Sequence, residues 1–276
     1  MQSMEKIIEI SGAENGPQSI ILAGTHGDEV CGIKALEKIL PSLKIERGRV
    51  FFGYGNPKAI ERNVRFTEAN LNRMFKDDPL LSEKEKRSYE YGRSRFLMGY
   101  LDRSEALLDL HASFVPKSDP FIICNDNARE IIEYFSPDIV VSGLDDIEPG
   151  GTDCYMNRNG KIGICVECGY LGDNDSAKQA EDAVFHFLVA RGHIKADIKA
   201  GPRKSFIKVY ILYITKTDSF VLSKKFDDFE EIAKGEMIGM DGKEEIRADR
   251  DSIILFARGR KAKGDEAFVL GECVKK

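Results

Sequence analysis

The chain has 276 residues, of which 42% are hydrophobic and 32% charged, and its formal net charge is −5. This length allows one large domain or two modest ones, and the composition is typical of a soluble globular protein. The acidic balance lacks the basic footprint of a nucleic-acid binder, and no apolar stretch approaches the roughly 20 residues that span a bilayer. We therefore expect neither a nucleic-acid partner nor a membrane partner.

The first two-thirds of the chain alternate strand-like and helix-like segments. Strands are predicted at 5–11, 18–24, 48–56, 105–112, 120–125, 138–143 and 162–169, helices at 28–40, 82–101, 126–135 and 176–192, and a polar loop at 63–75. This alternation predicts an α/β fold with a mainly parallel central sheet flanked by helices, in a domain covering 1–200. In such sheets functional sites gather beyond the carboxyl ends of the strands.

The texture changes from about residue 201, where short strands are broken by Gly and Asp turns. This pattern predicts a second, smaller, all-β domain over 201–276, of sandwich or barrel type. The basic stretch RGRKAKG, residues 258–264, lies among acidic neighbours, so we interpret it as a solvated loop.

The N-terminal segment 1–12 lacks the charge, apolar core and cleavage site of a secretory signal peptide. The six cysteines are scattered, mostly within apolar runs, as is typical of reduced and buried cysteines. Cys165 and Cys168 form a C-x-x-C pair, but residues three apart on a strand point to opposite faces, so a redox or zinc role is not expected. We predict a cytoplasmic protein.

The stretch ILAGTHGDE, residues 21–29, finishes an apolar run and then presents His26 and Glu29. Zinc hydrolases commonly hold the metal with two imidazoles and one carboxylate. Gly24 and Gly27 would allow the tight turn that brings both side chains to one ion. His111, at the end of the strand LLDLH, is the predicted third ligand.

Each of these residues also has an ordinary explanation, because Glu29 could be a first-turn helix acid and His111 a core histidine. Their combination favours a metal site, and we predict one Zn²⁺ per chain, although cobalt or manganese could bind the same ligands. Asp109 shares the His111 face of its strand and would accept a ring N–H. Glu167 interrupts an apolar strand and is the candidate general base.

Cationic side chains suggest an anionic substrate. Arg65, Asn72 and Arg73 lie within nine positions, and arginine binds carboxylates through two parallel hydrogen bonds. A solvated loop explains this stretch equally well. Arg158 is a weaker third clamp, since its surroundings, NRNGK, are also typical of a turn.

Together these residues resemble the succinylglutamate desuccinylase/aspartoacylase family, the acyl-amino-acid branch of the zinc carboxypeptidase superfamily. The matching signatures are GTHGDE (24–29), Arg65 followed by Asn72-Arg73, DLH (109–111) and Glu167 in GICVECG, together with the appended β domain. The resemblance covers nearly the whole chain. It implies a zinc-carboxypeptidase-like fold and hydrolysis of an amide between a short acyl group and an amino acid.

The resemblance also implies roles for single residues. The equivalents of His26, Glu29 and His111 bind zinc, and the equivalent of Glu167 is the general base and later an acid. The equivalent of Arg65 stabilises the oxyanion. The positions of Asn72 and Arg73 are those that bind a substrate carboxylate in the family.

Two departures concern substrate recognition. Aspartoacylase members carry an Arg ten residues before the base, where this chain has Asn157 followed by Arg158. They also carry a substrate-binding Tyr near the end of the β domain, where this chain has Phe268.

The sequence therefore predicts a zinc-dependent amidohydrolase that acts on carbon–nitrogen bonds other than peptide bonds, with a small anionic acyl-amino acid as substrate. One alternative is a zinc carboxypeptidase acting on short peptides. Another is a non-catalytic metal-binding protein whose β domain contacts a partner. The acyl group, the amino acid and the existence of a homo-oligomer are left open.

Overall fold

The computed structural model describes residues 5–274. Residues 1–4 and 275–276 lie outside the described part, so the first residues of the segment considered for a signal peptide are not covered. The core of the fold is an 11-stranded sheet in the order β1-β3-β2-β4-β7-β5-β6-β8-β14-β13-β10. Its strands are β1 (Ile8–Ser11), β2 (Glu14–Ala23), β3 (Arg47–Tyr54), β4 (Ala106–Ser113), β5 (Phe121–Cys124), β6 (Ile139–Ser142), β7 (Ile162–Tyr170), β8 (Ser205–Ile214), β10 (Glu230–Ile232), β13 (Ser252–Leu255) and β14 (Glu266–Cys273).

The part of this sheet that carries the predicted ligands is parallel. Strands β3, β2, β4 and β7 run parallel to one another, and so do β5, β6 and β8, while β5 and β7 pair antiparallel. The carboxyl ends of β2, β4 and β7 therefore meet at one edge of the sheet. The predicted α/β class with a mainly parallel central sheet is confirmed.

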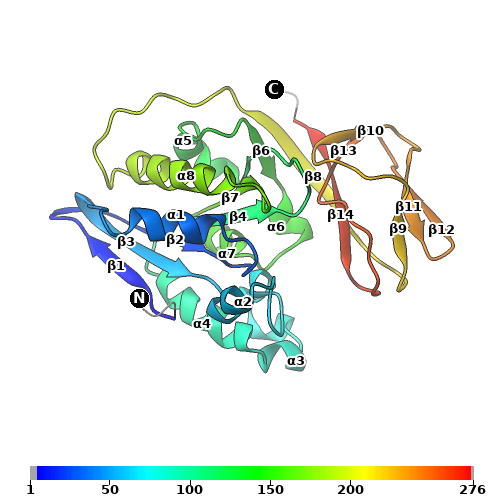
Figure 1. Ribbon diagram of the computed structural model, residues 1–276, viewed down its shortest axis with the longest axis horizontal. Coiled ribbons are helices and arrows are strands. Elements are labelled where there is room, and N and C mark those ends of the chain that lie inside the picture. The colour runs from blue at the N-terminus through cyan, green and yellow to red at the C-terminus, as the bar shows by residue number, and fades with distance from the viewer. Residues whose placement is uncertain (1–4, 275–276) are drawn as a thin grey trace.

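Helices cover both faces of the sheet (Figure 1). The helices are α1 (Cys31–Ile39), α2 (Pro57–Arg62), α3 (Glu83–Lys86), α4 (Tyr89–Leu101), α5 (Arg129–Ile132), α6 (Leu144–Ile147), α7 (Thr152–Arg158) and α8 (Ser176–Ala190), with 3-10 turns at Leu71–Arg73, Asp78–Leu80 and Asp126–Ala128. Along β2, Ile21 packs with α1 and α8 on one face, whereas Ile20 packs with α4 and α7 on the other. This alternation explains why β2 reads as a continuous apolar run.

The C-terminal strands extend the large sheet. Strand β8 pairs with β6 on one side and with β14 on the other, and β13 and β10 follow. A second sheet of β9 (Phe220–Leu222), β11 (Met237–Asp241) and β12 (Glu244–Arg247) packs beside β14 at the right of Figure 1, around a core that includes Phe220, Ile238 and Phe268. A smaller all-β region is thus present, and its division from the rest after residue 200 stays a prediction.

Several helix boundaries differ from the prediction. The predicted helix 82–101 is two helices, because Ser88 caps a second start by accepting a hydrogen bond from the Tyr91 backbone N–H. The helix predicted at 126–135 is reduced to a 3-10 turn and α5. Helices α2, α6 and α7 were not predicted, since they are only four to seven residues long and carry too few apolar positions for a helical period.

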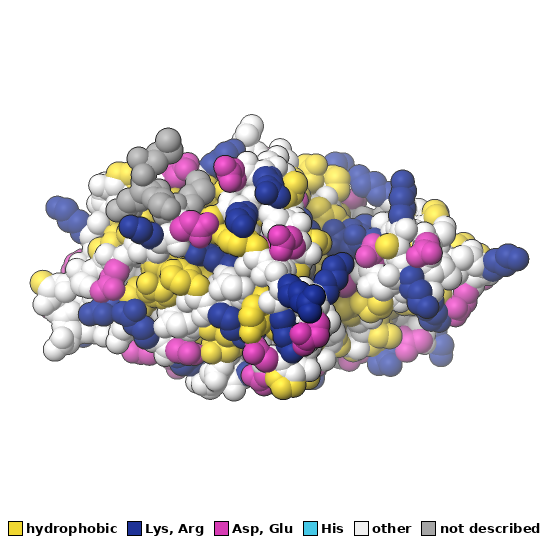
Figure 2. Space-filling model, turned by 90° about the horizontal axis from the view of Figure 1, so that it is seen from below, with side chains coloured by type: hydrophobic (Ala, Val, Ile, Leu, Met, Phe, Trp, Pro, Cys, Tyr) yellow, Lys and Arg dark blue, Asp and Glu magenta, His cyan; other side chains and the backbone are white. Residues whose placement is uncertain are grey.

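The surface carries both signs of charge. Figure 2 shows Lys and Arg side chains interspersed with Asp and Glu over one face of the molecule. Within residues 5–274, each helix is too short or too polar to cross a membrane.

Candidate metal and substrate site

The turn after β2 brings His26 and Glu29 together. Gly24 has a φ of +67°, and a Cβ there would lie 2.6 Å from Ile60, so the turn requires glycine. Gly27 has an ordinary φ, but a Cβ would lie 2.1 Å from the backbone of Ala59. Helix α1 begins only at Cys31, so Glu29 precedes the helix and is not one of its first-turn acids.

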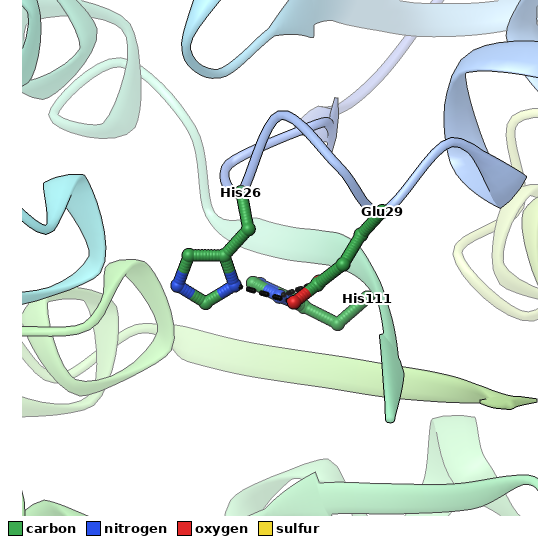
Figure 3. Close-up of side chains that lie close together, drawn as sticks. All are labelled: His26, Glu29 and His111. Carbon is green, nitrogen blue, oxygen red and sulfur yellow. Dashed lines mark hydrogen bonds and ion pairs between the residues drawn. The ribbon is translucent and has the colours of Figure 1, made fainter. Parts of the chain in front are cut away.

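Three side chains converge at this point, as Figure 3 shows. Oε1 of Glu29 lies 2.8 Å from Nδ1 of His26, and Oε2 lies 2.8 Å from Nδ1 of His111. One ligand atom from each of the three residues falls within 4.8 Å of the others. All three residues are buried, with exposed fractions of 2–4%. The predicted ligand set is therefore brought together by the fold.

Asp109 lies behind His111, with Oδ2 3.2 Å from the ring Nε2. The same carboxylate accepts hydrogen bonds from the hydroxyls of Thr25 and Thr152 and is fully buried. Strand β4 thus presents Asp109 and His111 on one face, as predicted for alternating strand positions. The two threonines hold the carboxylate in place, so it can orient the imidazole.

The buried ionisable groups in this cluster shift one another's pKa values. Burial alone would raise the pKa of Glu29, but His26 and His111 outweigh it and hold this pKa well below its usual range. Burial lowers the pKa of His26 to about 4, and the positive charge of Arg65 adds to the effect. For His111, burial is outweighed by Asp109 and Glu29, so its pKa is raised well above the usual value.

Glu167 lies beside the cluster on the neighbouring strand, in register with His111. Burial, followed by repulsion from Glu29, raises its pKa to about 8, while His111 and Arg65 oppose the shift. Its Oε2 is buried without a hydrogen-bond partner among the described residues. A buried carboxylate with a raised pKa and a free oxygen has the properties of a proton acceptor.

Arg65 reaches the cluster from the loop before the first 3-10 turn. Its guanidinium NH1 donates to Oε1 of Glu29 over 2.9 Å, and its backbone carbonyl accepts from the Gly27 N–H. The buried carboxylate of Glu90 organises this loop, because it accepts from the backbone and hydroxyl of Thr67 and from the backbone of Ala69. The loop, whose sequence is equally compatible with a solvated segment, is therefore held in place by the buried carboxylate of Glu90.

Asn72 and Arg73 both line the cavity. The Asn72 side-chain oxygen accepts from the Thr152 backbone N–H over 3.2 Å. Arg73 Nε and NH2 donate to the two oxygens of Glu266 over 3.0 and 3.2 Å, and NH2 also contacts Glu148. The guanidinium that the sequence assigns to a substrate is thus already paired inside the protein.

Arg158 is not brought to the cavity. It is exposed at the end of α7, where NH2 lies 3.6 Å from Asp77, and it is not among the residues that line the cavity. The preceding Asn157 is used internally, since its amide donates to Asp145 and accepts from the Gly163 backbone. The helix that forms here turns Arg158 away, which the sequence pattern of a simple turn did not reveal.

Arg258 lines the cavity instead, although the stretch 258–264 was interpreted as a solvated loop. That interpretation is wrong at its first residue, which is half-buried and stacked over Phe114. The strand after the stretch folds back, so the Arg258 N–H donates to the carbonyl of Ala267. A tertiary contact of this kind leaves no signal in local composition.

The cysteine pair behaves as the strand geometry predicts. Cys165 packs in a cluster between β7 and the C-terminal strands, and Cys168 packs on the opposite face.

Phe268 lies at the position where aspartoacylase members are expected to carry a Tyr. It stacks on Tyr213 with ring centroids 4.9 Å apart. Its ring belongs to the core of the C-terminal strands.

The residues present fit a zinc ion. Two imidazoles and a carboxylate are a usual donor set for a catalytic zinc. The Oε2 of Glu167 is a buried atom without a hydrogen-bond partner among the described residues, which is costly in a site made only of protein. Metal binding would displace the protons that the two rings share with Glu29.

Comparisons with known proteins bear on the family and the fold. The family model described as the succinylglutamate desuccinylase/aspartoacylase catalytic domain matches residues 15–191, which include every residue of the cluster. The succinylglutamate desuccinylase of Pseudoalteromonas atlantica is 22% identical over 300 residues, covering 95% of this chain and 83% of the relative. That of Pseudomonas putida is 40% identical, but only over 78 residues, or 26% of this chain and 23% of the relative.

Solved structures share the fold over nearly the whole chain. The succinylglutamate desuccinylase of Vibrio cholerae has a TM-score of 0.78 at 21% identity, covering 97% of this chain and 85% of that one. The product-bound ectoine utilization protein EutE (DoeB) from Ruegeria pomeroyi has a TM-score of 0.71 at 20% identity, covering 96% and 88%.

Proposed function

Because the chain belongs to the succinylglutamate desuccinylase/aspartoacylase family, we propose that it is a zinc-dependent hydrolase that cleaves the amide bond of a small N-acyl amino acid or related anionic amide. Deacylation of an N-acyl amino acid is the activity that the family names describe. The observation that carries the finer proposal is the convergence of His26, Glu29 and His111 in one buried cavity, with Glu167 beside them.

In this proposal His26, Glu29 and His111 hold the ion and Asp109 orients His111. Zinc bound there would supply Lewis acidity for the attacking water and a positive charge at the scissile carbonyl. The free oxygen of Glu167 would accept a proton as general base and later return it to the leaving amine.

Arg65 is the candidate for the oxyanion. Its guanidinium already lies at the ligand cluster, and it can donate to a carbonyl oxygen held there. Asn72 keeps its predicted role as an orienting amide, since it lines the cavity.

A small substrate is favoured over a peptide because the C-terminal region contributes part of the cavity wall. The lining includes Phe256, Arg258 and the run Glu266–Val269 as well as the ligand cluster. A carboxypeptidase acting on peptides needs a longer open groove.

The proposed cellular location remains the cytoplasm.

The first test is metal content together with turnover. The purified chain should carry about one zinc, and His111→Ala should lose it, whereas His186→Ala on α8 should retain it. A chelator should abolish hydrolysis of a panel of N-acetyl and N-succinyl amino acids, and added zinc should restore it.

The other outcomes are equally informative. Hydrolysis of short peptides alone would favour the carboxypeptidase alternative. Zinc-loaded protein that hydrolyses nothing in either panel would favour a non-catalytic binding protein. Absence of zinc from the wild-type chain as well as from His111→Ala would overturn the metal site itself.

A further inference from the structure

The cavity has a second charged cluster, formed by Arg73, Glu148 and Glu266, the last of which begins β14. Glu266 takes two hydrogen bonds from the Arg73 guanidinium, and Arg73 NH1 donates to the Asn72 backbone carbonyl over 2.7 Å. Burial opposes the charge of Arg73, but Glu148 and Glu266 raise its pKa. Two carboxylates therefore already satisfy this guanidinium, which leaves it little capacity for a third.

Arg258 is in the opposite situation. Among the described residues its guanidinium forms no ion pair with a carboxylate, and its Nε is buried without a hydrogen-bond partner. Burial lowers its pKa to about 9, the guanidiniums of Arg260 and Arg65 add to the shift, and the carboxylates of Glu266 and Glu148 oppose it. Both of these carboxylates are already bonded to Arg73, so a further anion is needed to pair with the half-buried guanidinium of Arg258.

The surroundings of Arg258 also determine how such an anion could bind. The guanidinium carbon lies 4.1 Å from the centroid of the Phe114 ring, so one flat face of the group is covered. Stacking of this kind leaves the N–H edge available for a carboxylate, which matches that edge with two parallel hydrogen bonds. Neighbouring Arg260 is used differently, because its Nε donates to the Glu266 backbone carbonyl and it does not line the cavity.

We propose that Arg258, in the loop between β13 and β14, binds a carboxylate of the substrate. The proposal rests on the proposed function and assigns its specificity to a residue that the sequence pattern placed in solvent. Arg73 then acts as an internal ion-pair partner that fixes Glu148 and Glu266 at the cavity wall. The carboxylate can come from the amino acid or from the far end of a dicarboxylic acyl group, and the experiment distinguishes these two sources.

The experiment compares Arg258→Gln and Arg258→Lys with the wild-type enzyme. Arg250→Gln is the matched control, because Arg250 is also stacked on an aromatic ring, 4.5 Å from the Tyr210 centroid, but is exposed and outside the cavity. Substrates are the best member of the acyl-amino-acid panel, its α-carboxamide, and its N-acetyl and N-succinyl forms. Thermal unfolding reports whether each variant folds.

Arg258→Gln should raise KM by roughly 10- to 100-fold for the substrate that keeps the recognised carboxylate, with a much smaller change in kcat. The same variant should leave KM for the neutral counterpart nearly unchanged, so discrimination between the two is lost. If Arg258→Gln no longer discriminates between the substrate and its α-carboxamide, Arg258 binds the amino-acid carboxylate. If it no longer discriminates between the N-succinyl and N-acetyl forms, Arg258 binds the acyl carboxylate. Arg258→Lys should show a smaller loss. Equal discrimination in wild type, Arg258→Lys and Arg258→Gln would overturn the proposal.

Calorimetric binding of succinate and of L-glutamate to the zinc-loaded protein separates this proposal from the proposed function. If the enzyme hydrolyses nothing but one of these anions binds roughly 10- to 100-fold more weakly to Arg258→Gln, the hydrolase fails and the anion site stands. If turnover is observed but anion binding and KM are the same in both proteins, the hydrolase stands and the role of Arg258 fails. Should Arg258→Gln not fold, Arg258→Lys in the same assays decides the question.

Discussion

The cavity contains two charged clusters that satisfy their charges in different ways: the proposed metal ligands, called here the metal end, and the cluster around Arg73, called the arginine end. At the metal end, His26, Glu29 and His111 contact one another, and the first two are only three positions apart in the sequence. At the arginine end, Arg73 and its partner Glu266 are 193 positions apart. The metal end follows from a turn and neighbouring strand ends, whereas the arginine end exists only because the C-terminal strands return to the cavity. In the proposed function, the residues for the reaction and the residues for substrate choice therefore come from different ranges of the sequence.

The largest effect should come from the metal end. Glu167→Gln should lower kcat by roughly 100- to 10,000-fold, because the amide cannot take a proton from the attacking water. Zinc content, measured by elemental analysis, should remain that of the wild type. Substantial residual turnover would show that Glu167 is not the general base. The contrast between a catalytic end and a substrate-binding end would then lose its main support.

Asp109→Asn should have the next largest effect. The carboxylate lies 3.2 Å from His111 Nε2 and is held by two threonine hydroxyls, so its loss should weaken zinc binding by roughly 10- to 100-fold. Competition with a zinc chelator measures the change. Unchanged affinity would show that His111 is oriented by strand packing alone.

A smaller effect, in pH dependence, should come from the arginine end. Burial raises the pKa of Glu148 to about 7, with Arg73 opposing the shift. In the unfolded chain this group ionises near its ordinary value of 4.5, so the folded state binds more protons between pH 4.5 and 7. The contribution of Glu148 to stability is therefore complete below pH 4.5 and is lost as the pH rises through 7.

Glu148→Gln should remove this loss, so its free energy of unfolding should change less than that of the wild type between pH 4.5 and 7.5, by on the order of 1 kcal/mol. Urea denaturation at both pH values measures it. Glu266→Gln is the opposite control. Arg73 outweighs burial and lowers the pKa of Glu266 to about 2, so that stability is present above pH 4.5 and lost towards pH 2. Parallel pH profiles for Glu148→Gln and the wild type would contradict the assignment.

The smallest effect should follow Arg158→Gln. The side chain is exposed and its contact with Asp77 spans 3.6 Å, and such surface pairs contribute about 0–1 kcal/mol. Both kcat and KM should stay within about twofold of wild type, and the melting temperature should be nearly unchanged. A clear rise in KM would restore Arg158 as a substrate clamp and place a fourth guanidinium at the cavity, beside Arg65, Arg73 and Arg258.

Sequence patterns predicted the long elements and their class well, because the hydrophobic pattern of a strand or helix of eight or more residues repeats often enough to be recognised. Short helices were missed, and α7 shows the consequence, since it exposes Arg158 where a turn was expected. The loop around Arg65 was undecided from sequence for a similar reason. Its fixed shape depends on the carboxylate of Glu90, which lies on a helix further along the chain.

By itself the sequence determined the family, the α/β class and the side chains gathered at the metal end. These depend on residue type, on a glycine turn with a φ of +67° at Gly24, and on the rule that parallel strands end at one edge. Only the tertiary structure decided which arginine is paired and which lacks a counter-ion. Pairing and burial depend on contacts between distant segments, and Glu266 and Arg258 reach the cavity only after the C-terminal strands have folded back onto it.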